Sequence, residues 1–202
     1  MKIPFPLPVD DKRHRYCQNC YSENVHDEVI EGKQLYKCDN CGNTYDRLID
    51  VDPKLVWWVD QKTKDYWHES VGVFVTNPKK EMLFIERTIY PYGFTIPSGH
   101  LEIAEDPEDA AKRELVEETG IEAQILTYYK DIKIHKDPCR RGADSHLWHV
   151  YTYLLENRLD IITNPGEGIN PVWLTLNKAL SKKLTPPVQY LLEKYGKGFT
   201  GS

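Results

Sequence analysis

Hydrophobic residues recur along the chain in short, strand-length runs separated by polar turns. The turn at Asn77–Pro78, for example, separates two such runs, and Asn and Pro are typical of the loops that join strands. No run approaches the ~18 consecutive apolar residues that a membrane-spanning helix needs. The pattern predicts a strand-rich protein without a membrane span. The predicted strands cover residues 55–59, 66–68, 71–75, 82–85, 125–129, 130–135, 147–155 and 172–174.

Two segments carry the signals of helices. Asp106 is a suitable N-cap, Pro107 tolerates the first helical position, where no N–H is needed, and Gly120 predicts the helix end. A second helix is predicted from about Thr185 to Gly196. Strands interleaved with two substantial helices predict an α+β fold in which the helices cover a sheet.

Four of the five cysteines form two Cys-x2-Cys pairs near the N-terminus, separated by seventeen residues. Each pair can present two thiolates to one tetrahedral Zn²⁺, and the hydrophobic residues between the pairs fit a small hairpin. Two disulfides are the alternative, but nothing in the sequence indicates an oxidising compartment. We therefore expect a small N-terminal zinc-ribbon β domain that depends on its metal to fold. Its ligands would be Cys17, Cys20, Cys38 and Cys41.

Charge is distributed unevenly along the chain. The net charge is −5, from 26 basic and 31 acidic residues, yet residues 102–118 alone hold eight carboxylates against two basic side chains. Residues 12–50, by contrast, hold six basic and seven acidic residues, so the ribbon has no basic face and nucleic acid is not an expected partner. The acidic segment is either a solvated helix face or a cation site.

The spacing of three glutamates favours the cation site. Glu114, Glu117 and Glu118 stand at positions i, i+3 and i+4, which share one face of a helix. Such carboxylates repel one another unless a cation neutralises them, and ligation by oxygen alone favours Mg²⁺ or Mn²⁺ over zinc.

The loop before this helix completes a longer motif. Residues 99–121 read Gly-x5-Glu-x7-Arg-Glu-Leu-x-Glu-Glu-x-Gly-Ile, which matches the Nudix box at every fixed position. From about residue 70 to residue 196 the sequence resembles Nudix hydrolases, and the resemblance implies their α/β/α sandwich. One departure is Ser98, where family members often have a second glycine.

The resemblance implies a Mg²⁺- or Mn²⁺-dependent pyrophosphohydrolase that acts on a nucleoside diphosphate linked to another moiety. The residues expected to hold the metal are Glu114, Glu117 and Glu118, with a backbone carbonyl of Ser98 or Gly99. Arg113 would orient Glu114, while Glu105 and Gly120 would support the loop–helix–loop structure. The general base is expected to be either Glu114 or Glu167, since some family members use a glutamate from a late loop.

Substrate contacts are expected from arginines, which suit phosphate oxygens, and from aromatic rings, which can stack on a base. The candidates are Arg87, Tyr92, Phe94, Arg140 and Arg141, although each taken alone also fits an ordinary surface or core role. His146 and His149 are three apart in a predicted strand, so they should point to opposite faces. Cys139 is expected to be an inert thiol.

A ribbon followed by a Nudix domain is similar to NADH pyrophosphatases, but their SQPWPFPxS signature is missing here. NAD(H), ADP-ribose, dinucleoside polyphosphates and nucleoside triphosphates therefore all remain candidate substrates. The alternative is a non-hydrolytic, nucleotide-sensing protein that uses the ribbon as a docking module. We expect a cytoplasmic protein, since residues 1–17 lack the apolar core of a signal peptide. The sequence does not decide whether the protein forms a homodimer.

The expected organisation has five parts. Residues 1–16 form an N-terminal tail, 17–45 the zinc ribbon, 46–70 a connecting β segment, 71–196 the Nudix domain and 197–202 a C-terminal tail.

Overall fold

The computed structural model describes residues 1–156, 160–166 and 168–200. Three helices lie in this part of the chain: α1 (Pro107–Thr119), α2 (Leu176–Leu180) and α3 (Pro186–Phe199). The strands are β1 (His14–Tyr16), β2 (Val25–Ile30), β3 (Lys33–Cys38), β4 (Thr44–Tyr45), β5 (Ile49–Val51), β6 (Trp57–Val59), β7 (Tyr66–Thr76), β8 (Met82–Arg87), β9 (Phe94–Thr95), β10 (Ser98–His100), β11 (Thr127–His135), β12 (Ser145–Leu154) and β13 (Gly168–Leu174).

Strand β7 is the centre of the large mixed sheet, whose main order is β11-β12-β7-β8-β13. One edge of β7 pairs in parallel with β12 along almost its full length. The other edge pairs in succession with β6, β10 and β8, all antiparallel. Strand β10 leads into residues 101–106, the acidic loop before α1. The pairing of β10 with β7 therefore positions the start of this loop against the middle of the sheet.

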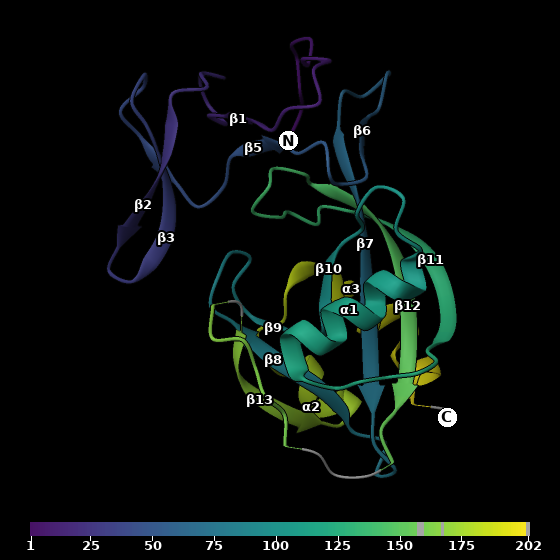
Figure 1. Cartoon of the computed structure of the whole chain (residues 1–202). Coiled ribbons are helices and arrows are strands. Elements are labelled where there is room, and N and C mark those ends of the chain that lie inside the picture. Colours follow the sequence, from purple (N-terminus) through teal and green to yellow (C-terminus); the bar gives the residue numbers. More distant parts are fainter. Residues whose placement is uncertain (157–159, 167, 201–202) are drawn as a thin grey trace.

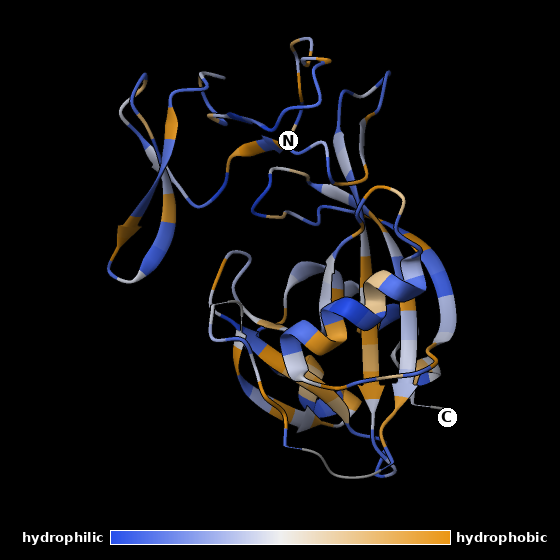
Figure 2. Cartoon of the chain, viewed as in Figure 1, coloured by the Kyte–Doolittle hydropathy of each residue, from blue (hydrophilic) through white to orange (hydrophobic). Residues whose placement is uncertain are grey.

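Helices cover both faces of this sheet, as the sequence predicts for an α+β sandwich. Alternate residues of a strand point to opposite faces, so Val71, Val73 and Val75 pack with α1, whereas Phe74 packs with α3. Figure 1 shows α1 crossing in front of the sheet and α3 partly hidden behind it. The hydrophobic colouring of β7 behind α1 marks the core between these layers (Figure 2).

The N-terminal region forms two small sheets. Strands β2, β3 and β4 make the cysteine-bearing hairpin, and β1 pairs with β5. The hairpin turn is at Glu31 and Gly32, both with positive φ, and it lies inside the segment where the sequence predicts a hairpin. In Figure 1 the β2–β3 hairpin stands apart from the sandwich, to which it is joined through β1 and β5.

The structure differs from the sequence expectations at the ends of the main unit. Strand β7 runs without a break from residue 66 to 76, so no structural boundary lies at residue 70. Helix α3 continues to Phe199, whose ring stacks on Phe74 with 3.8 Å between centroids, inside the expected tail. The start of the expected N-terminal tail is also packed, since Ile3 is buried and the Met1 amino group donates to the Gly142 carbonyl, whereas residues 9–13 are exposed.

Candidate active site and metal centres

Helix α1 is held by the local signals that the sequence predicts. The Asp106 carboxylate accepts a hydrogen bond from the Glu108 N–H at 2.8 Å, and Pro107 is the first residue of the helix. At the other end Gly120 adopts φ 71° and its N–H caps the Val116 carbonyl at 2.8 Å. A non-glycine side chain is disfavoured in this left-handed conformation. These caps fix the start and end of the helix that carries the glutamates.

Two of the three glutamates face inward. Glu114 and Glu118 are 9% and 6% exposed, while the Glu117 side chain is 58% exposed. The Glu118 carboxylate accepts a hydrogen bond from the backbone N–H of Ser98 at 2.8 Å. The Glu114 carboxylate covers Gly99 so closely that a Cβ built on Gly99 would overlap it. The residue at position 99, in β10, must therefore be glycine if Glu114 is to keep this position.

Arg113 ties the acidic loop to the helix. Its guanidinium donates to both oxygens of Glu105, at 2.8 and 3.0 Å, and to Glu114 at 2.7 Å. It also donates to the His100 carbonyl at 3.4 Å. The hydrogen bonds from Arg113 hold the pKa of Glu105 below its usual value, and the same contacts raise the pKa of Arg113. Arg113 thus fixes the orientation of Glu114 while it keeps Glu105 ionised.

A cavity of about 230 Å³ opens beside these residues. Its wall combines carboxylate oxygens and backbone groups with arginine side chains, a set suited to a hard divalent cation and to phosphate oxygens. The residues that form this part of the wall are Arg87, Ser98, Gly99, Glu114, Glu118, Arg140 and Arg141. Arg140 also donates to Gln34 at 2.8 Å, and Arg141 to Asp50 at 2.8 Å, so the N-terminal region holds both arginines in place.

Two aromatic candidates lie away from the cavity wall. The Tyr92 hydroxyl donates to Asp46 at 3.2 Å, and Lys33 stands over the Tyr92 ring. Phe94 packs against the hydrophobic core between the sheet and α3. The structure does not bring either ring to the glutamates. Glu167 lies outside the described residues.

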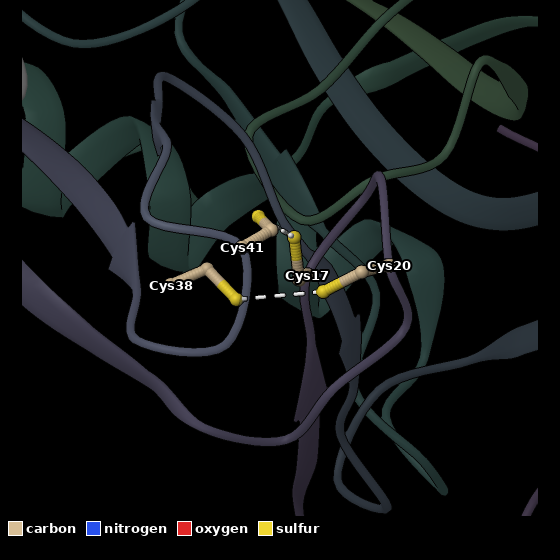
Figure 3. A group of neighbouring side chains, drawn as sticks. All are labelled: Cys17, Cys20, Cys38 and Cys41. Atoms are coloured by element: carbon tan, nitrogen blue, oxygen red, sulfur yellow. Dashed lines mark hydrogen bonds between the residues drawn. The ribbon is translucent and has the colours of Figure 1, made fainter.

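The four N-terminal cysteines converge on one point (Figure 3). Their sulfur atoms are 3.7 Å apart for Cys17 and Cys41 and 3.6 Å for Cys20 and Cys38, too far for disulfides. Four thiolates on a tetrahedral Zn²⁺ with bonds of about 2.3 Å would stand roughly 3.8 Å apart. Backbone and side-chain amides also donate to the sulfurs of Cys17 and Cys20, each at 3.4 Å. The donor set and the spacing fit zinc.

A second cluster of metal-ligating side chains lies on strands of the large mixed sheet and on the connection between β11 and β12. It consists of His68, His100, Cys139 and His146, whose ligand atoms all lie within 4.8 Å of one another. Sequence reasoning missed this cluster, because its members are distributed over eighty residues without a local motif. His149, the other histidine of β12, bonds instead to Asp131 and Glu69, each at 2.8 Å. As expected for two strand residues three positions apart, His146 faces the cluster whereas His149 faces Asp131 and Glu69.

Comparison with known proteins identifies the family. A NUDIX domain matches residues 66–195. The RNA pyrophosphohydrolase of Hamiltonella defensa is 33% identical over 86 residues, which cover 40% of this chain and 52% of that protein. This chain therefore spans about half of that relative.

Solved structures show the same fold. The MutT protein from Methanosarcina mazei superposes with a TM-score of 0.57 at 19% identity, over 68% of this chain and 98% of that chain. The NUDIX domain of Shewanella oneidensis NrtR, solved with ADP ribose, gives a TM-score of 0.56 at 17% identity, over 69% and 92%.

The sandwich and its capped acidic helix define a Nudix fold. Because the NUDIX domain takes up more than half of its length, the chain belongs to the Nudix family, with a cysteine cluster in an N-terminal β region. The match begins at residue 66, where β7 begins. Among the described residues, no helix combines the length and the apolar composition that a membrane crossing would require.

Proposed function

We propose that this protein is a Mg²⁺- or Mn²⁺-dependent pyrophosphohydrolase that cleaves a phosphoanhydride bond in a nucleoside diphosphate linked to another moiety. The observation that carries the proposal is the inward-facing pair Glu114 and Glu118 beside the backbone of Ser98 and Gly99. Two buried carboxylates held this close to an arginine-lined cavity supply oxygen ligands for a cation and contacts for phosphate. The RNA pyrophosphohydrolase relative supports the same reaction class.

Each residue has a defined task in this reaction. Glu114, Glu117 and Glu118 would hold the cation, with a carbonyl of Ser98 or Gly99. When bound, Mg²⁺ or Mn²⁺ neutralises phosphate oxygens and lowers the pKa of a bound water. Arg113 keeps the Glu114 oxygens aimed at the cavity, and the Ser98 N–H does the same for Glu118.

The substrate would lie along the arginine side of the cavity. Arg87, Arg140 and Arg141 would contact its phosphate oxygens, since a planar guanidinium matches that geometry. Either Glu114 or Glu167 would accept the proton of the attacking water. The Cys17, Cys20, Cys38 and Cys41 cluster would hold a structural Zn²⁺ that keeps the β2–β3 hairpin folded. Through Gln34 this hairpin contacts Arg140, so the ribbon would also steady one wall of the cavity.

The test is product analysis by chromatography. NAD(H), ADP-ribose, dinucleoside polyphosphates and nucleoside triphosphates are each incubated with Mg²⁺ or Mn²⁺ and either the unaltered protein or Glu118→Gln. We expect the substitution to lower turnover at least about 10²-fold, the size typical of losing one preorganised electrostatic contact. Because glutamine can still accept from the Ser98 N–H, the variant should stay folded.

Glu122→Gln is the matched control, because Glu122 is exposed and lies beyond the end of α1. It should retain full turnover. Normal turnover by Glu118→Gln would refute the metal site. If folded, unaltered protein cleaves none of these nucleotides but binds them, the non-hydrolytic sensing function would replace the proposal.

A further inference from the structure

The cluster formed by His68, His100, Cys139 and His146 is assembled from four separate parts of the fold. His68 lies on β7, His100 on β10, His146 on β12 and Cys139 in the connection between β11 and β12. The His68 and His146 side chains are almost fully buried, with 0% and 2% of each residue exposed. The Nδ1 atom of His68 is 3.7 Å from the Cys139 sulfur. All four ligand atoms lie within 4.8 Å of one another.

We propose that this cluster, here called the His3Cys site, binds a second Zn²⁺ ion. Three imidazoles and one thiolate complete a tetrahedral zinc shell. With bonds of about 2.3 Å to sulfur and about 2.05 Å to nitrogen, sulfur and nitrogen ligands stand roughly 3.6 Å apart. The observed 3.7 Å between His68 and Cys139 fits this value. This distance is similar to the two sulfur–sulfur distances in the four-cysteine cluster of the same chain.

The hydrogen bonding of the cluster is otherwise incomplete. The Nε2 atoms of His68 and His100 are buried and find no hydrogen-bond partner among the described residues. A buried polar atom without a partner destabilises the folded state. Bringing three imidazoles and one thiol together in the interior is therefore costly in a structure stabilised by packing alone. A cation at the centre, bound through His68 Nδ1 and one nitrogen of each other ring, would offset the cost of bringing the four side chains together.

An outer carboxylate supports His146 as a ligand. The Asp137 Oδ2 atom lies 3.0 Å from His146 Nδ1, although the contact lacks the geometry of a regular hydrogen bond. The same oxygen accepts from the Trp148 indole N–H at 2.7 Å, and Asp137 is buried. Metal-bound histidines commonly have a carboxylate on the second ring nitrogen, which fixes the ring orientation. The other nitrogen of His146 is then free to face the cation.

The position of the His3Cys site connects it to the catalytic cavity. His100 directly follows Gly99 and its carbonyl accepts from Arg113, so a metal on His100 would hold β10 in place under Glu114. Cys139 directly precedes Arg140 and its own carbonyl accepts from Arg47 at 2.8 Å. With all four positions filled by protein ligands, the ion would be structural. It would join the cavity wall to the N-terminal region whichever substrate is cleaved.

The experiment measures zinc in the full-length protein by elemental analysis, after purification with reductant and added Zn²⁺ and removal of unbound metal. We expect about two Zn²⁺ per chain, one for the four cysteines and one for the His3Cys site. Cys139→Ser and His146→Gln should each lower the content to about one. His149→Gln is the matched control, because His149 lies on the same strand but bonds to Asp131 and Glu69, and it should keep about two.

A spectroscopic measurement separates the two sites without relying on a single variant. In a Cys38→Ser, Cys41→Ser background only the His3Cys site keeps its ligands. Adding Co²⁺ to this protein should produce a thiolate-to-cobalt absorption band that is lost on further substitution of Cys139 by Ser. Circular dichroism verifies that each variant is folded. About one Zn²⁺ in the unaltered protein, unchanged in Cys139→Ser, together with no cobalt band in the ribbon-deficient background, would overturn the proposal.

Discussion

Replacing Gly99 by alanine should disable the active site through one added carbon atom. A Cβ at this position would overlap the Glu114 Oε1 and Cδ atoms and lie 2.5 Å from Oε2. Ordinary contact begins at about 3.4 Å, so the carboxylate has to retreat by about 1 Å or more. A displacement of this size in a catalytic group costs about 10²-fold in rate. The displacement of the carboxylate also strains the hydrogen bond of 2.7 Å that Arg113 donates to Glu114.

The cost to stability should be moderate. Overpacking a well-packed site costs about 1–3 kcal/mol, which for a chain of this size is a fall in Tm of about 2–12 °C. The assays are Mn²⁺ titration followed by electron paramagnetic resonance, hydrolysis of the preferred nucleotide, and thermal unfolding. Mn²⁺ affinity and turnover should both fall by much more than the loss of stability explains.

Gly196→Ala provides the comparison. Its Cβ would meet the flexible end of Leu176 at 2.5 Å, so it imposes a packing cost far from the glutamates. We expect a lower Tm but unchanged Mn²⁺ affinity and turnover. If Gly99→Ala behaves like Gly196→Ala, or if it retains turnover within threefold of the unaltered protein, then the close contact with Glu114 does not position the carboxylate.

Two further predictions concern stability. Glu105→Gln should lower the free energy of unfolding by about 1 kcal/mol at pH 7. Arg113 holds the folded-state pKa of Glu105 below its unfolded value of about 4.3. The difference in stability between the two proteins should therefore vanish as the pH falls through the folded-state pKa. Urea unfolding at several pH values tests this, and a difference that persists at pH 2 would contradict it. Phe199→Ala should cost about 3–5 kcal/mol, since Phe199 is 4% exposed and stacked on Phe74. Thermal unfolding should show no such loss for Ile125→Ala, which removes a side chain that is 77% exposed.

Local signals in the sequence are sufficient to predict the parts of the structure that depend on neighbouring residues. The limits of α1 follow from Asp106, Pro107 and Gly120, and all three act in the structure as their chemistry predicts. The hairpin between the cysteine pairs is likewise confirmed. The contact between Arg113 and Glu105, eight residues apart, was also within reach, because the helix fixes the direction of one partner and the loop is short.

The sequence predicts the position of a side chain less accurately where that position depends on tertiary packing. The sequence places Phe199 in the expected C-terminal tail, but Phe199 fills a space against Phe74 that only the folded sheet creates. Residue type alone makes Tyr92 and Phe94 substrate candidates beside Arg87. The direction of each ring depends on the path of the chain around β9, and the structure turns both away from the cavity wall.

Sequence by itself determined the fold family, the four-cysteine cluster and the carboxylate face of α1, because each depends on a motif of residues that lie close together along the chain. Tertiary structure alone decided which of those carboxylates are buried and brought His68, His100, Cys139 and His146 together. The parallel pairing of β12 with β7 sets His146 directly opposite His68, and the pairing of β10 with β7 brings in His100. Strand registers of this kind join residues about eighty positions apart, and no local spacing encodes them.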